Sequence, residues 1–140
     1  MEDLEKSQRT KTQGSKKLIR ILVVDDDVTF GKNFAAILED KGYTATLVDS
    51  GNAAITELGG AHFDLAFVDI KLPDINGVEV LRKIKEVSPK TRVVVITAFP
   101  LDKLLMEAVE QGAFDYFCKP FDVNAVLQVV KDLSSPKRES

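Results

Sequence analysis

The chain has 140 residues, of which 44% are hydrophobic and 29% are charged, and its formal net charge is −3. This is the composition of an ordinary globular protein, and the length suits one domain. A single cysteine excludes an internal disulfide framework. No apolar run approaches the ~20 residues that a membrane-spanning helix needs. We therefore expect a cytoplasmic protein that does not associate with membranes.

Charge is unevenly distributed along the chain. Residues 1–17 carry five basic and three acidic side chains, and this polar segment is expected to be a disordered basic leader. Residues 134–140 are expected to be a polar tail or the start of a linker. Residues 18–133 are expected to form the folded domain, with 12 basic and 18 acidic side chains. Their net charge of −6 argues against direct nucleic-acid binding, which requires a basic surface.

Five short apolar segments of residues 18–133 have the composition of β-strands. In chain order, these strands are predicted at about 20–24, 43–48, 64–68, 92–96 and 114–117. Three of the segments are near-continuous apolar runs. Such runs are typical of a parallel sheet that is covered by helices on both faces.

Helical patterns separate and follow the predicted strands, and Gly or Pro marks most of the helix ends. The helices are predicted around residues 30–38, ending near Gly42; 54–58, ended by Gly59 and Gly60; 78–84, closed before Pro89; 101–109, with Gly112 past the end; and 123–130, with Asp122 as N-cap. Strict alternation predicts an α/β fold with right-handed crossovers. We expect a doubly wound, five-stranded parallel sheet of flavodoxin-like order 2-1-3-4-5 with five helices.

Polar side chains follow the predicted strands at their carboxyl ends, where ligands gather in such folds. These residues are Asp25, Asp26 and Asp27 after the first strand, Asp69 at the end of the third, Thr97 at the end of the fourth and Lys119 after the fifth. Adjacent carboxylates repel one another, so either all three are solvated or a cation belongs among them, and a hard-oxygen site of this kind suits Mg²⁺ or Mn²⁺. Asp27 is instead expected to lie in solvent near the N-terminus of the first helix.

The same group of residues suits phosphoryl transfer. Asp69 is best placed to attack phosphorus and become an acyl phosphate, because it ends the middle strand of the sheet. A metal ion and Lys119 together would stabilise the charge on the equatorial phosphoryl oxygens. The Thr97 hydroxyl would bond to another of these oxygens.

Four segments resemble the receiver domains of bacterial two-component response regulators: ILVVDDD, FVDIKLPDINGVEVLRKIK, VVVITAF and GAFDYFCKPF. They occur in order and cover about residues 18–133. The last two are most similar to the receivers that control sigma-factor-dependent AAA+ activators. Pro100 is a departure, because many relatives have a small or polar residue there. Since Pro suits the first turn of a helix, the fourth helix is expected to start more rigidly.

The resemblance implies a phosphorylation-activated switch. Asp69 would accept a phosphoryl group from a histidine kinase or a phosphotransfer protein. The domain would catalyse its own phosphorylation and dephosphorylation without being a turnover enzyme. Mg²⁺ would be bound directly by Asp26, with help from Asp25, together with Asp69 and the backbone carbonyl of Lys71.

Further implied roles concern the response to phosphorylation. Thr97 and Lys119 would bind phosphoryl oxygens, a cis peptide would precede Pro120, and Tyr116 would be the switch aromatic. Phosphorylation is expected to draw the Thr97 hydroxyl toward the new group and to let Tyr116 rotate inward. The face of the fourth helix, fifth strand and fifth helix would then bind a partner or form a homodimer. Its expected apolar residues are Leu101, Leu104, Leu105 and Met106.

Two other functions compete with the switch. A phosphohydrolase of the haloacid dehalogenase type carries a second Asp two residues after the nucleophile, where this chain has Lys71. An interaction module with an inactive site would lack the acceptor Asp69 or the basic residue Lys119, and both are present. We expect either a stand-alone receiver or the N-terminal part of a longer regulator whose output domain is missing here.

Overall fold

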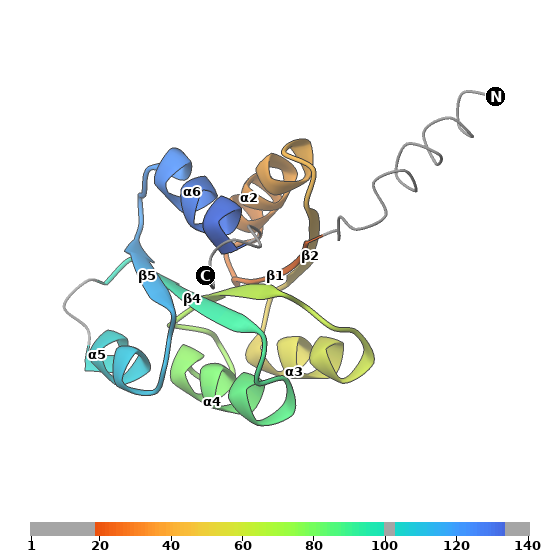
Figure 1. The fold of residues 1–140 in the computed structure, drawn as a ribbon. Helices are drawn as coiled ribbons and strands as arrows, with labels where there is room; N and C mark the ends of the chain where they lie inside the picture. Colours follow the sequence, from red (N-terminus) through yellow and green to blue (C-terminus); the bar gives the residue numbers. More distant parts are fainter. Residues whose placement is uncertain (1–18, 100–102, 134–140) are drawn as a thin grey trace.

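A five-stranded parallel sheet positions the candidate site residues in the computed structural model, which describes residues 19–99 and 103–133. The strands lie side by side in the order β2-β1-β3-β4-β5 (Figure 1). Their bounds are Arg20–Val24 (β1), Thr44–Val48 (β2), Leu65–Asp69 (β3), Arg92–Thr97 (β4) and Asp115–Cys118 (β5). The predicted fold class and strand order are confirmed, and each strand boundary lies within one residue of its predicted place.

Helices cover both faces of the sheet. Figure 1 shows α2 and α6 on one face and α3, α4 and α5 on the other. The bounds of these helices are Val28–Asp40 (α2), Gly51–Gly60 (α3), Gly77–Val87 (α4), Lys103–Glu110 (α5) and Val123–Leu133 (α6). Within the described residues, no helix has the length and apolar character that crossing a membrane would require.

The apolar runs of the central strands serve two separate cores. Successive side chains of a strand point to opposite faces of the sheet. Leu22 and Val24 therefore pack with the α3, α4 and α5 side, whereas Ile21 and Val23 pack with α2 and α6. All four are fully buried, which explains why β1 shows no alternation of apolar and polar residues.

Carboxylates fix the starts of two helices. Asp27 Oδ1 accepts the backbone N–H of Phe30 at 3.1 Å and caps α2, a more specific role than the solvated position predicted for it near the start of this helix. Asp122 Oδ1 accepts the N–H of Asn124 at 2.9 Å in front of α6, which confirms the predicted N-cap. After α2, Gly42 has a φ of 99°, a left-handed conformation that favours glycine.

Two predictions about helices need correction. α3 includes Gly59 and Gly60 instead of ending before them, because the Ala61 N–H still bonds to the Glu57 carbonyl and continues the helical pattern. Leu105 on α5 is only 5% exposed and belongs to the core, and Leu104 packs against that core. Leu105 therefore does not lie on the exposed apolar face predicted for it and Leu104 is only partly exposed, while Pro100 and Leu101 lie outside the described residues.

Strand register brings the polar strand ends together. Val24 of β1 pairs with Val68 of β3, so Asp25 and Asp69 both follow paired residues at the same edge. Asp69 in turn pairs with Ile96, directly before Thr97. The parallel sheet thus gathers residues that are far apart in sequence at one edge.

Candidate functional site

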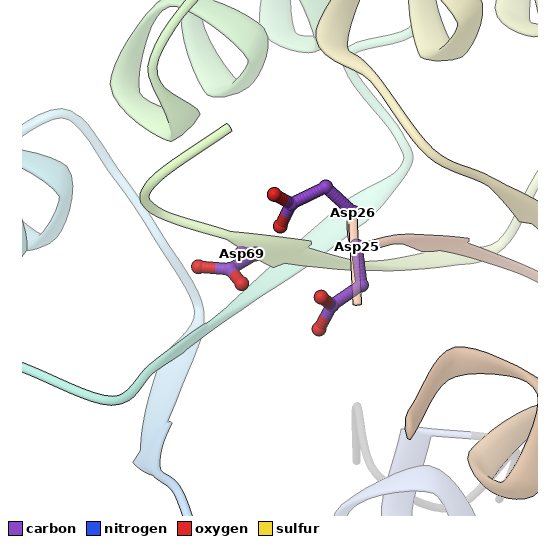
Figure 2. Close-up of side chains that lie close together, drawn as sticks. All are labelled: Asp25, Asp26 and Asp69. Atoms are coloured by element: carbon purple, nitrogen blue, oxygen red, sulfur yellow. The ribbon is translucent and has the colours of Figure 1, made fainter. Parts of the chain in front are cut away.

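Three carboxylates meet at the carboxyl edge of the sheet. One oxygen from each of Asp25, Asp26 and Asp69 lies within 4.8 Å of the others (Figure 2). Asp25 is fully buried and Asp69 is 8% exposed, whereas Asp26 faces solvent. In Figure 2, Asp25 and Asp26 point to opposite sides of the end of β1, and Asp69 lies beside both. Three hard oxygen donors of this kind fit a Mg²⁺ ion, which prefers carboxylates and also binds phosphate oxygens.

Lys119 is shared between the two buried carboxylates. Its Nζ lies 2.7 Å from Asp25 Oδ2 and 3.3 Å from Asp69 Oδ2. Burial raises the pKa of Asp25, and the nearby Asp69 charge adds to this, while Lys119 opposes it. Burial alone would lower the pKa of Lys119, but the hydrogen bond to Asp25 and the two negative charges raise it above its ordinary value. Lys119 contacts Asp25 and Asp69, and the third carboxylate, Asp26, lies beside them, so the cluster of negative charge suits a cation.

Backbone N–H groups fix the orientation of the buried carboxylates. The Asp27 N–H donates to Asp25 Oδ1 at 2.9 Å, and the Lys71 N–H donates to Asp69 Oδ1 at 3.0 Å. Each buried carboxylate therefore has one oxygen held by the backbone two residues on and the other held by Lys119. This arrangement leaves the two side chains little freedom to rotate.

Thr97 and Tyr116 differ sharply in exposure. Thr97 at the end of β4 is fully buried, and its Oγ1 accepts the N–H of Phe99 at 2.9 Å. Tyr116 on β5 is 47% exposed. Lys119 is tied to β4 by its own N–H, which donates to the Thr97 carbonyl at 2.7 Å, and the peptide between Lys119 and Pro120 is cis.

Three contacts around the site are not predicted by the sequence. The ring centroid of Phe30 lies 4.3 Å from Lys119 Nζ, and the ring centroid of Phe99 lies 5.1 Å from Lys71 Nζ. Asp74, in the loop between β3 and α4, accepts backbone N–H groups at the start of α3. The sequence pattern places Phe30 in the core stripe of its helix, and nothing in the local sequence distinguishes it from such a residue.

Comparison with known proteins gives the family. Residues 21–131 match the model of the response regulator receiver domain. The chain belongs to this family. It is therefore a receiver domain, and receiver domains are signalling domains of two-component response regulators rather than classical enzymes.

Curated relatives point to one subgroup of regulators. The chain is 33% identical over 122 residues to the transcriptional regulatory protein ZraR of Salmonella typhimurium, covering 87% of this chain and 28% of ZraR. It is 39% identical over 101 residues to the alginate biosynthesis regulator AlgB of Pseudomonas putida, covering 72% of this chain and 22% of AlgB. The chain thus spans about a quarter of the length of these relatives. They are sigma-54-dependent AAA+ response regulators, which confirms the predicted resemblance.

Solved structures show the same fold. A CheY-like receiver domain protein from Methanospirillum hungatei superposes with a TM-score of 0.82 at 30% identity, covering 89% of this chain and all of that one. The beryllofluoride-activated NtrC4 receiver domain dimer gives a TM-score of 0.76 at 32% identity, covering 81% and 94% of the two chains.

Proposed function

We propose that this domain accepts a phosphoryl group on Asp69 from a histidine kinase or a phosphotransfer protein, with Mg²⁺ bound beside it. The observation that carries the proposal is the Lys119 ammonium, which bridges Asp25 and Asp69 at the carboxyl edge of the sheet. It supplies the positive charge that an incoming phosphoryl dianion requires. A response regulator from Burkholderia pseudomallei, 26% identical to this chain, has been solved with a phosphorylated aspartic acid and a calcium ion.

The chemistry assigns one role to each residue. An oxygen of Asp69 attacks phosphorus in line, an O–P bond forms, and the N–P bond of phosphohistidine breaks, with the electron pair leaving on the imidazole nitrogen. Lys119 turns from Asp69 toward the phosphoryl oxygens, while the Lys71 N–H keeps the carboxylate oriented. Asp26, Asp25 and Asp69, with the carbonyl of Lys71, would hold Mg²⁺. When bound, the ion neutralises phosphoryl charge.

Phosphorylation would then be read out on one face of the domain. The Thr97 hydroxyl accepts a hydrogen bond from Phe99 and would turn to donate to a phosphoryl oxygen. Tyr116 is exposed and would rotate inward, which changes the face of α5, β5 and α6. The exposed apolar residues on α5, on β5 and directly before β5 are Met106, Val109, Phe114 and Tyr116. We propose that this face binds a partner or a second copy of the domain, and the beryllofluoride-activated receiver domain of the relative NtrC4 is itself a dimer.

The same proposal includes the segments that flank the domain and its location in the cell. Residues 18–133 would be the receiver, preceded by a basic leader and followed by a polar tail or linker to an output domain. Location in the cytoplasm, where a kinase could phosphorylate it, is proposed on the same grounds.

Incubation with acetyl phosphate and Mg²⁺ tests the function. A switch should yield one slowly decaying phosphoryl group per domain, measured by intact-mass spectrometry, and none without Mg²⁺. Continuous release of phosphate over many turnovers would indicate a hydrolase. The absence of any phosphorylated species would indicate an inactive interaction module and would contradict the proposal.

A further inference from the structure

The Lys119 ammonium has a third neighbour in addition to Asp25 and Asp69. Its Nζ lies 4.3 Å from the ring centroid of Phe30, in the first turn of α2. An ammonium over an aromatic face is attracted by the ring quadrupole, most strongly where water is excluded. The Lys119 side chain is 17% exposed, so Phe30 lies against a largely desolvated charge.

Other aromatic rings hold Phe30 in place. It stacks on Phe34 with the centroids 5.7 Å apart, and the ring of Phe121 meets it edge-on at 5.7 Å. Phe34 in turn meets Phe67 of β3 edge-on at 5.0 Å. The cluster thus connects the Phe30 ring of α2 to β3 and to the segment after β5. Asp69 ends β3, and Lys119 lies in the segment after β5.

Phe30 is less buried than other rings of this cluster. Phe34 is 2% exposed and Phe67 is fully buried, whereas Phe30 is only half-buried. Phe30 therefore lies at the margin of the cluster, between the packed rings and the Lys119 ammonium. A core-filling role alone would be met by an aliphatic side chain of similar size, but an aliphatic side chain offers an ammonium no electrostatic attraction.

We propose that Phe30 is a positioning residue for phosphoryl transfer, whose ring holds the Lys119 ammonium at the acceptor and lets it follow the phosphoryl group. This inference rests on the proposed phosphorylation of Asp69. A carboxylate binds an ammonium through N–H groups that point at its oxygens, whereas a ring face attracts the charge as a whole and does not require one N–H to point at a single atom. Lys119 can therefore exchange an Asp69 oxygen for a phosphoryl oxygen without being released to water.

Fluorination of the ring separates this role from packing. Monofluoro- and trifluorophenylalanine at position 30 nearly keep the size of the ring but weaken the negative potential of its face step by step. With saturating Mg²⁺, we expect the second-order rate of phosphorylation by acetyl phosphate to fall in the order of fluorination, by about fivefold in total. Phe30→Leu, which has no ring, should lose about tenfold. The Mg²⁺ affinity should stay constant across the series.

A second measurement does not depend on activity. In the metal-free domain, the ammonium protons of Lys119 should show an upfield ring-current shift by NMR, and Phe30→Leu should remove it. Phe117→Leu is the matched control, because its ring packs on Phe121 in the same cluster, 6.0 Å between centroids. It should leave both the shift and the phosphorylation rate unchanged.

The outcomes distinguish the two proposals. A rate that is independent of fluorination, in a domain that is phosphorylated on Asp69, would overturn the role of Phe30 and leave the proposed function intact. Equal rate losses in Phe30→Leu and Phe117→Leu would also overturn it, because the effect would then follow packing. A wild-type domain that is not phosphorylated at all would overturn the proposed function itself.

Discussion

Buried polar groups at the two edges of the sheet differ in how fully they are compensated by partners. At the edge where the strands begin, Thr91 is fully buried, and its hydroxyl donates to the Phe63 carbonyl at 2.6 Å. Asp64 accepts the N–H of Arg20 at 2.9 Å. These polar groups therefore have partners that compensate for their burial, and they leave no cluster of like charges for a ligand to meet.

At the edge where the strands end, the negative charges of the carboxylates are only partly compensated. Asp25 and Asp69 are buried side by side and share the single ammonium of Lys119, with Asp26 close by. Like charges held together cost folding free energy unless a cation compensates them. The candidate site thus lies at the edge where the sequence departs from what folding alone favours.

Lys119→Ala should have the largest effect. Without the ammonium, Asp25 remains buried beside Asp69 with no opposing charge, so the free energy of unfolding of the metal-free domain should fall by about 3 kcal/mol. Phosphorylation by acetyl phosphate should slow by at least about a hundredfold. Mg²⁺ binding should remain, because its carboxylate ligands are intact. Urea unfolding and phosphorylation kinetics measure the two effects.

Arg92→Ala at the opposite edge is the matched control for Lys119→Ala. The Arg92 guanidinium also lies over a ring, 5.0 Å from the centroid of Phe114, but it is exposed. Its removal should cost at most about 1 kcal/mol and leave phosphorylation unchanged. Similar losses of stability and phosphorylation rate in the two variants would contradict the difference proposed between the two edges of the sheet.

Asp26→Ala should weaken Mg²⁺ binding by at least about tenfold, since it removes a direct oxygen ligand. It should also stabilise the metal-free fold, because one of the three clustered negative charges is gone. The neighbouring variant Asp27→Ala should do the reverse: it keeps the Mg²⁺ affinity but loses about 1 kcal/mol of stability with the cap of α2. Calorimetric Mg²⁺ titration and urea unfolding measure both, and wild-type affinity in Asp26→Ala would refute the assignment.

Thr97→Ala tests the coupling between the site and the α5–β5–α6 face. With Mg²⁺ and beryllofluoride, the wild-type domain should shift toward a dimer in light scattering, and Thr97→Ala should shift much less, because its side chain cannot donate to the bound group. A wild-type domain that stays monomeric in both states would refute dimerisation. A Thr97→Ala variant that dimerises as well as the wild type would refute this coupling route.

Asp74→Asn should have the smallest effect, visible as a pH dependence. The N–H groups of Asn52 and Gly51 bond to Asp74 at 2.8 and 2.9 Å and lower its pKa. The folded state then binds fewer protons than the unfolded state just below the ordinary carboxyl pKa, so this stabilisation is lost as the pH falls through the lowered value. The stability difference between wild type and Asp74→Asn should shrink in acid. A difference that is constant with pH would contradict this.

The sequence predicts the fold well because its signals are local. Buried strands with apolar runs alternate with helical patterns, and this alternation restricts the sheet to few orders once crossovers are right-handed. The acidic cluster follows from the same rule, since ligands gather at the carboxyl ends of strands. Residues such as Asp25, Asp69 and Lys119 can therefore be placed together before any contact is known.

Contacts that depend on how helices rotate against the sheet cannot be predicted in this way. Phe30 reads as one more apolar residue of a helix stripe, and only the packing of α2 turns its ring to Lys119. Leu105 is predicted to contribute to an interaction face, but the packing of α5 places it in the core. Gly59 and Gly60 read as a helix end, yet the hydrogen bond from Ala61 to Glu57 continues the helix through them.

Locating the phosphoryl group tests the proposed role of Asp69 directly. The domain should be treated with acetyl phosphate and Mg²⁺, reduced with borohydride to trap the acyl phosphate, and sequenced by tandem mass spectrometry, with Asp69→Asn as the control. We expect a single reduced residue at Asp69 in the wild type and none in the variant. Modification at Asp25, Asp26 or Asp74, or an equal yield in Asp69→Asn, would contradict it.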